Sequence, residues 1–129
     1  MTVLLPQPLP ATGGWQLVDW RDDSYTSPPA AGGVATITLP QLDSAERWQL
    51  THMVASCAGT AAPAMRLYLG SVQPLNFRDG TASGAFDVAD WPMGLMLPPG
   101  AQLIAQWTGC NTGDVAALSL QANVYRRTS

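Results

Sequence analysis

The chain has 129 residues, of which 47% are hydrophobic and only 12% are charged, and its formal net charge is −3. This composition excludes a disordered chain, and no basic stripe indicates a nucleic-acid-binding surface. The length fits one domain with a real hydrophobic core. Charged residues reach about half of their usual share. A surface with so little charge is easier to understand if partners cover much of it, so we expect a homo-oligomer.

The first 14 residues contain three prolines at alternate positions and end in a pair of glycines. This spacing favours an extended or polyproline-II chain and disfavours a central strand. We therefore expect an extended N-terminal arm over residues 1–14 and a β-sandwich domain over residues 15–129. The arm either lies across its own domain or reaches a neighbouring subunit, and the sequence leaves both open. Its apolar residues, which are candidates for an interface, are Val3, Leu4, Leu5 and Leu9.

The start of the chain lacks the basic region and the long apolar core of a signal peptide. No apolar run approaches the length of a membrane span, so we expect no contact with a membrane. The protein is therefore expected to be made in a cytosol.

Short segments with strand character lie between clusters of proline and glycine after the arm. They are residues 15–20, 34–39, 47–56, 65–71, 94–97, 101–108 and 115–125. Several of them alternate between apolar and polar residues, which is the pattern of a sheet with one buried face. Seven or eight such strands predict an all-β fold, a single antiparallel β-sandwich of the jelly-roll type.

The predicted core includes two tryptophans, Trp48 and Trp107, which fall on the apolar faces of their strands. The only histidine, His52, shares the predicted face of Trp48 and Val54. A catalytic histidine needs a nucleophile or an acidic partner within reach, and the chain has no GxSxG motif. We therefore interpret His52 as a hydrogen-bonded core or edge residue.

Residues 76–109 hold three aspartates and two tryptophans between strand-like stretches. Asp79 and Gly80 are typical of a turn, and Asp87 and Asp90 of loops in which the side chain binds nearby backbone N–H groups. Trp91 would then lie in an exposed loop and contact a partner. The corner at Pro98-Pro99-Gly100 would also be exposed, so Trp91, Pro98 and Pro99 are interface candidates.

The sequence predicts no catalytic, metal-binding or cofactor-binding residues, and therefore no enzyme. The aspartate spacing fits no Ca²⁺ loop, and no Cys/His spacing suggests zinc. Cys57 and Cys110 are too few for a disulfide framework and are expected to be small buried hydrophobic residues. They could pair only if their strands are neighbours.

Several motifs between Glu46 and Tyr125 occur in an order that is distinctive when taken together. They are "ERWQLTHMVAS", "AMRLYLG", "NFRDGTASGAFDVAD" and "LMLPPGAQLIAQWTGCNTGDVAALSLQANVY". This order resembles a group of small structural proteins of tailed bacteriophages. The resemblance implies a β-sandwich virion component without catalytic residues, whose partners are a major capsid protein or tail proteins.

Among virion roles we favour capsid decoration, in which the protein cements capsomers and binds copies of itself. A small domain with an apolar Pro-rich arm suits such clamping, since proline lowers the entropy lost on ordering. The alternative is a small minor tail or adsorption protein with a carbohydrate-binding face for a surface glycan. An exposed cluster of tryptophan and aspartate would favour the alternative. Trp15 and Trp20 flank the first predicted strand, and the sequence does not decide whether they pack inside the domain or contact a partner.

Overall fold

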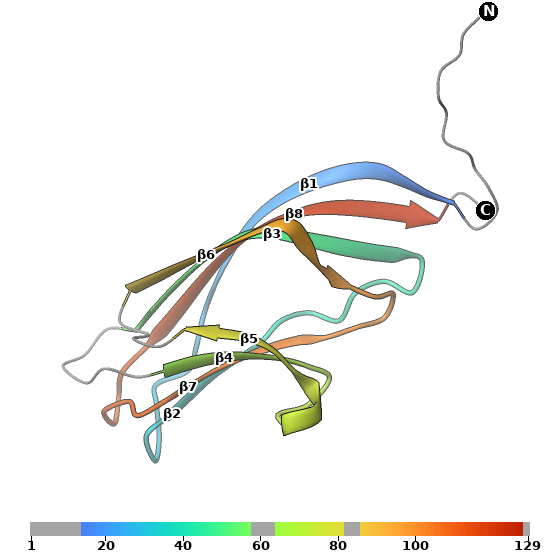
Figure 1. Cartoon of the computed structure of the whole chain (residues 1–129). Coiled ribbons are helices and arrows are strands. Elements are labelled where there is room, and N and C mark those ends of the chain that lie inside the picture. The colour runs from blue at the N-terminus through green and yellow to red at the C-terminus, as the bar shows by residue number, and fades with distance from the viewer. Residues whose placement is uncertain (1–13, 58–63, 82–85, 128–129) are drawn as a thin grey trace, which may run out of the picture.

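The computed structural model describes residues 14–57, 64–81 and 86–127. It contains two four-stranded antiparallel sheets packed face to face, one above the other in Figure 1. The arm residues Val3, Leu4, Leu5 and Leu9 lie outside the described residues. In the part of the chain that is described, no helix has the length and apolar character needed to span a membrane.

The strands and one short 3₁₀ helix follow each other as expected for an all-β chain. They are β1 (Trp15–Thr26), β2 (Val34–Thr38), β3 (Glu46–Cys57), β4 (Ala64–Leu69), η1 (Pro74–Asn76), β5 (Phe77–Thr81), β6 (Phe86–Leu97), β7 (Leu103–Thr108) and β8 (Ala116–Arg127). The upper sheet has the order β1-β8-β3-β6, and the lower sheet has the order β2-β7-β4-β5.

The strand pairs are nested, as in a long hairpin that has been rolled up. The first strand pairs with the eighth, the second with the seventh, the third with the sixth and the fourth with the fifth. Two interlocked Greek keys of this kind form an eight-stranded jelly roll. The predicted fold class is therefore confirmed.

The core lies between the two sheets and is built from alternate residues of the central strands. In β8 every second residue from Ala116 to Val124 is buried, as the alternation predicts. Trp107 on β7 is fully buried and is the largest core side chain. Trp48 is only partly buried, and packs against the core from its rim.

A bulge in β3 overturns the predicted faces of that strand after Leu50. The pairing of β3 with both neighbouring strands shifts between Leu50 and His52. One extra residue reverses the alternation, because side chains of a strand point to opposite faces in turn. Leu50 is buried before the bulge and Met53 is buried after it, so His52 points to the outer face instead of the core side.

The predicted turn at Asp79-Gly80 is wrong, since both residues lie inside β5. Gly80 pairs with Arg66 of β4. A Cβ atom at Gly80 would come within 2.7 Å of the Met65 carbonyl oxygen. The glycine is therefore explained by close approach of two strands rather than by a turn.

The predicted loop over Asp87, Asp90 and Trp91 is also wrong, since all three belong to β6. The predicted first strand is too short, because β1 continues to Thr26 through six further residues, of which three are charged. Strand β1 is at the edge of its sheet, where charged side chains can stay in water.

Candidate functional site

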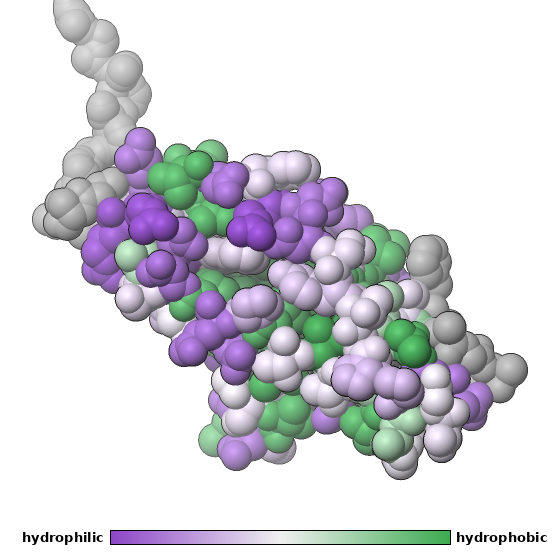
Figure 2. Space-filling model, turned by 180° about the vertical axis from the view of Figure 1, so that it is seen from behind, coloured by the Kyte–Doolittle hydropathy of each residue, from purple (hydrophilic) through white to green (hydrophobic). Residues whose placement is uncertain are grey.

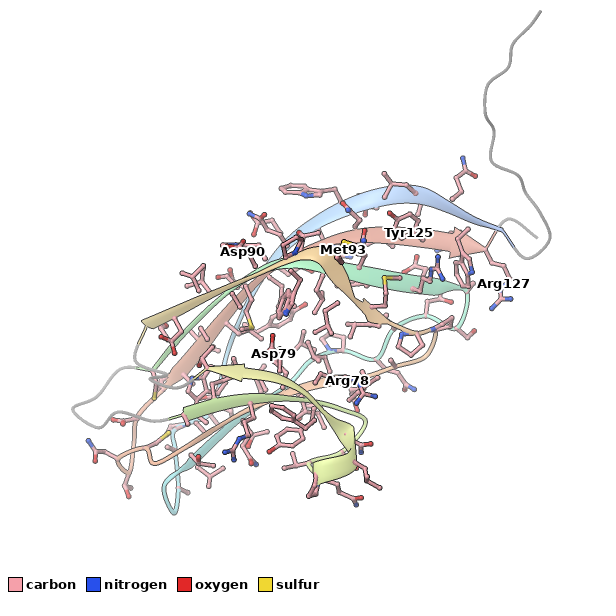
Figure 3. All side chains as sticks on the ribbon, viewed as in Figure 1. Arg78, Asp79, Asp90, Met93, Tyr125 and Arg127 are labelled. Atoms are coloured by element: carbon pink, nitrogen blue, oxygen red, sulfur yellow. The ribbon has the colours of Figure 1, made fainter. Side chains whose placement is uncertain are left out.

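Trp91 joins the two sheets at the edge formed by β5 and β6. Its indole nitrogen donates a 2.7 Å hydrogen bond to Oδ2 of Asp79 on β5, in the opposite sheet. Trp91 is half-buried and packs against the core. Figure 3 shows Asp79 below β6, on the strand that faces it. The Trp91 side chain therefore points into the sandwich. A contact of Trp91 with a partner stays a prediction.

The chain turns Trp91 inward through a local break in the ladder between β3 and β6. One residue of β3 lies between His52 and Leu50, whereas four residues of β6 lie between their partners Asp90 and Leu95. Gly94 completes the break with φ of 81°, a conformation that favours glycine. Met93 at the tip of the break is 88% exposed.

The two corner prolines are accessible to different degrees. Pro98 is exposed and Pro99 is half-buried, within a turn closed by the 3.1 Å bond from Ala101 N to the Pro98 carbonyl. The corner therefore has the exposure that an interface requires, and its contact with a partner stays a prediction.

His52 and Asp90 form a side-chain pair on the outer face of the upper sheet. Nδ1 of His52 lies 2.6 Å from Oδ1 of Asp90, and both side chains are accessible to solvent. The prediction that His52 is hydrogen-bonded is confirmed. An exposed pair on the outer face of a sheet excludes little water, whereas acid–base catalysis gains from a dry and shaped site.

Strand β1 presents exposed apolar side chains on the free edge of the upper sheet. Leu17 is 55% exposed, Val18 is 47% exposed and Trp20 is 59% exposed. A bulge at Val18 shifts the pairing of β1 with β8 and places both Leu17 and Trp20 opposite outward-facing residues. Figure 2 shows hydrophobic residues interrupting a hydrophilic surface in several separate places.

Arginines and aromatic rings stack where β1 begins and β8 ends. The guanidinium of Arg47 lies 4.8 Å from the ring centre of Trp15 and 5.8 Å from that of Tyr125. Arg127 lies 4.7 Å from the same Trp15 ring. Such cation–π contacts help to hold the first residues of β1 against the end of β8.

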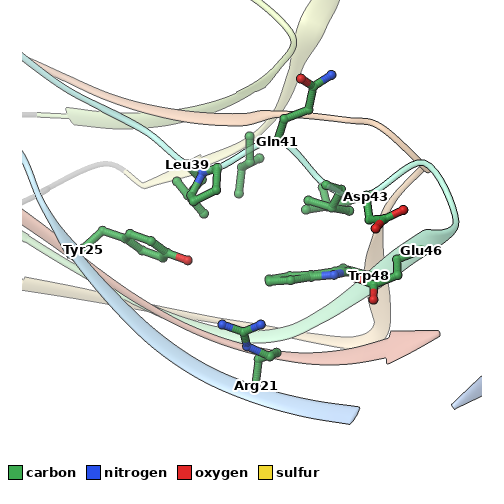
Figure 4. Close-up of a pocket in the computed structure, with 11 residues that line it drawn as sticks. Arg21, Tyr25, Leu39, Gln41, Asp43, Glu46 and Trp48 are labelled. Atoms are coloured by element: carbon green, nitrogen blue, oxygen red, sulfur yellow. The ribbon is translucent and has the colours of Figure 1, made fainter. Parts of the chain in front are cut away.

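A cavity of about 220 Å³ opens between the sheets on the β1 side. Arg21 of β1 extends between the Tyr25 ring and Trp48, and its guanidinium lies 5.4 Å from the Trp48 ring centre (Figure 4). Polar residues of the segment that leads into β3 complete the lining, and they include Gln41 and Asp43. The sequence could not locate this cavity, because its residues come from distant segments.

Charges at the cavity are balanced by neighbours on β1. Arg21 pairs with Asp23 at 3.0 Å, and the Tyr25 hydroxyl donates to the same carboxylate at 3.4 Å. Burial and then the negative charge of Asp23 raise the pKa of Tyr25, which stays a neutral hydroxyl. The cavity therefore offers rings, a hydroxyl, an amide and a carboxylate, which suits a small polar molecule.

A second, shallower hollow of about 410 Å³ lies over the lower sheet near η1. It is lined by Arg66, Pro74 and the edge-to-face pair Tyr68 and Phe77, whose ring centres are 6.1 Å apart. Within the described ranges, no group of three or more His, Cys, Asp or Glu side chains could hold a metal ion.

No protein-family model matches the chain, and no curated protein matches it either. Solved structures with a distantly similar fold include PliG of Aeromonas hydrophila, a periplasmic inhibitor of g-type lysozyme. It is 12% identical with a TM-score of 0.35, and the match covers 82% of this chain and 84% of PliG.

Dimeric latent PorU of Porphyromonas gingivalis is 11% identical with a TM-score of 0.39, covering 86% of this chain and 13% of PorU. The virus-like particle of the extra small virus of the prawn Macrobrachium rosenbergii is 11% identical with a TM-score of 0.37, covering 98% and 92%. These likenesses are too distant to carry a functional argument.

Proposed function

We propose that the protein is a non-enzymatic structural component of a virion, and specifically a capsid decoration protein that binds capsomers and copies of itself. The observation that carries the proposal is the exposure of Leu17, Val18 and Trp20 on an edge strand of a domain with little surface charge. Exposed apolar side chains on a sheet edge favour association with another chain.

The fold and the sequence motifs add different kinds of support. Jelly rolls occur in viral capsid and lectin domains, so the architecture is compatible with both proposed roles and does not choose between them. The segment 46–125 resembles small structural proteins of tailed bacteriophages, and this resemblance favours a role as a virion component.

The test is light scattering coupled to size-exclusion chromatography, on the chain alone and mixed with capsids that lack it. We expect an oligomer that binds those capsids. The double variant Leu17→Thr/Trp20→Thr should dissociate at concentrations where the wild type stays assembled, because Thr keeps strand propensity but removes apolar area. Val88→Thr is the matched control, since Val88 is exposed on the opposite edge strand.

A monomer that ignores capsids would contradict the decoration role. A chain lacking residues 1–13 adds a separate comparison. If the arm clamps a neighbour, that chain should keep its β-type circular dichroism and lose capsid affinity. Unchanged affinity would show that the arm is not the clamp.

The cavity beside Trp48 favours a second candidate, a minor tail or adsorption protein that binds a surface glycan. Aromatic rings with a few convergent polar groups are typical of small-ligand sites, and those of Tyr25 and Trp48 border this cavity. A glycan array tests it. Binding that is lost in Tyr25→Phe but kept in Val88→Thr would support this role, and an array without any binding would exclude it for the glycans present.

A further inference from the structure

The two cysteines meet across the core although their strands belong to different sheets. Cys57 ends β3 in the upper sheet, and Cys110 follows β7 in the lower sheet. Their sulfur atoms are 3.9 Å apart, and no disulfide joins them. Two sheets that pack face to face therefore bring the two thiols together although their strands are not neighbours.

We propose that Cys57 and Cys110 are a modification site, at which oxidation forms a disulfide bond that links the two sheets. The sulfurs need to approach by about 2 Å to reach a bond length of about 2.05 Å. Rotation of two side chains can supply much of this movement. The backbone is held nearby, since Cys57 pairs with Ala116, and Cys110 N donates to the Gly33 carbonyl at 3.0 Å.

The oxidant is a small disulfide such as oxidised glutathione. The Cys110 thiol, in the segment that follows β7, loses its proton and attacks one glutathione sulfur, which releases one glutathione. The Cys57 thiol then loses its proton and attacks the mixed disulfide at the Cys110 sulfur, which releases the second glutathione. The protein loses two electrons and two protons, and glutathione disulfide gains them.

Burial makes this reaction slow at neutral pH. Cys57 is 4% exposed and Cys110 is 8% exposed, so an oxidant reaches them only after local opening. Burial and the hydrogen bond to Cys110 raise the pKa of Cys57 to about 11, and only the thiolate attacks. The thiols should therefore survive in a reducing cytosol and become oxidised during long exposure to an oxidising medium.

The structure predicts a large effect on stability, because the cysteines are 53 positions apart. Closing a loop of that length restricts the unfolded chain and should raise the melting temperature by roughly 10 °C or more. By linkage, the native chain should form the disulfide on the order of a thousand-fold more favourably than the denatured chain.

The experiment equilibrates the full chain with mixtures of reduced and oxidised glutathione, in buffer and in concentrated urea. Acid quenching, alkylation and mass spectrometry then count the remaining thiols, and non-reducing peptide mapping locates the bond. We expect an intramolecular 57–110 bond, the thousand-fold preference and a higher melting temperature for the oxidised chain. Cys57→Ala and Cys110→Ala control for glutathione adducts and disulfide-linked dimers.

Three results would overturn the proposal. One is equal oxidation of native and denatured chains, which would mean that the fold holds the sulfurs apart. Another is a product made of glutathione adducts or disulfide-linked dimers. The third is a 57–110 bond that leaves the melting temperature unchanged or lowers it.

Discussion

The bridge between Trp91 and Asp79 allows a direct test of how the sandwich is closed at the β5–β6 edge. Trp91→Phe keeps a ring at the core but removes the indole N–H that donates to Asp79 at 2.7 Å. A hydrogen bond to a charged group contributes about 1.5–3 kcal/mol, and Asp79 can regain water at this edge. We therefore expect a loss of about 2 kcal/mol in the free energy of unfolding.

Urea denaturation followed by circular dichroism measures this loss. With an m-value of about 2 kcal/mol/M, the midpoint should fall by roughly 1 M. Asp79→Asn keeps an acceptor without charge and should cost about 1 kcal/mol. The double variant should lose less than the sum of the two single losses, by about 1 kcal/mol, because both remove the same bond.

Two outcomes would refute the reasoning. Strictly additive losses would mean that the two side chains do not interact. A Trp91→Phe chain with unchanged unfolding but weaker assembly would mean that Trp91 serves an interface, as the sequence predicted, rather than the closure of its own sandwich.

Three further predictions concern backbone strain, pH and the core. Gly94→Ala should destabilise the fold by more than Gly100→Ala, by roughly 1–3 kcal/mol in urea denaturation. Both glycines have positive φ, but a Cβ at Gly94 would come within 2.3 Å of the Gln49 side chain, whereas a Cβ at Gly100 would meet nothing within 4 Å. Equal losses of stability in the two variants would contradict this explanation. The reduced chain should lose stability between pH 9 and 11, since the pKa of Cys57 rises from 9.0 to about 11 on folding. Above pH 9 the unfolded thiol loses its proton while the folded thiol keeps it. The contribution to stability is therefore complete below pH 9 and is lost as pH rises through 11. A series of urea denaturations at different pH values should show this fall, and Cys57→Ala should reduce it. Leu118→Ala should cost about 2–5 kcal/mol, because Leu118 is fully buried and the mutation leaves a cavity; a smaller loss would mean that the core collapses around it.

The strands that alternate regularly could be predicted from the sequence, and β8 is the clearest case. Each second residue from Ala116 is buried, because β8 lies between two strands and pairs with both over its whole length. One buried face and one outer face impose the period of two that the sequence shows.

His52 and Gly80 show why other features could not be predicted. The bulge leaves no local signature in the "QLTHM" segment of β3, so the sequence pattern places His52 on the same face as Leu50, whereas the extra residue turns it to the outer face. Glycine serves both turns and close strand contacts, and only the 2.7 Å approach to Met65 distinguishes them at Gly80. Both errors concern tertiary pairing, which a local pattern does not encode.

The positions of Trp91 and the two cysteines depend on contacts between the sheets, and a local sequence pattern does not predict such contacts. The sequence around Trp91 contains aspartate, proline and glycine, which are typical of a loop. In the fold, the same residues form a break in β6 that turns the indole toward β5. The cysteines, likewise, meet only because the end of β3 and the segment after β7 come together although they belong to different sheets.

The two lateral edges of the sandwich differ in a way that predicts where a partner docks. At the β5–β6 edge, Trp91 and Asp79 tie the sheets together. At the edge that carries β1, exposed Leu17 and Trp20 accompany an unpaired side of a long strand. An assembly of this protein should therefore bury β1 and leave β5 and β6 as they are in the monomer.

Hydrogen exchange on the assembled and dissociated protein can test this assignment edge by edge. Amides on the unpaired side of β1 should exchange at least several-fold more slowly in the assembly, whereas those of β5 should keep their rates. Comparable protection of β5 would place the partner on the opposite edge. In that case the exposed tip at Met93, rather than the apolar residues of β1, would be the surface to mutate next.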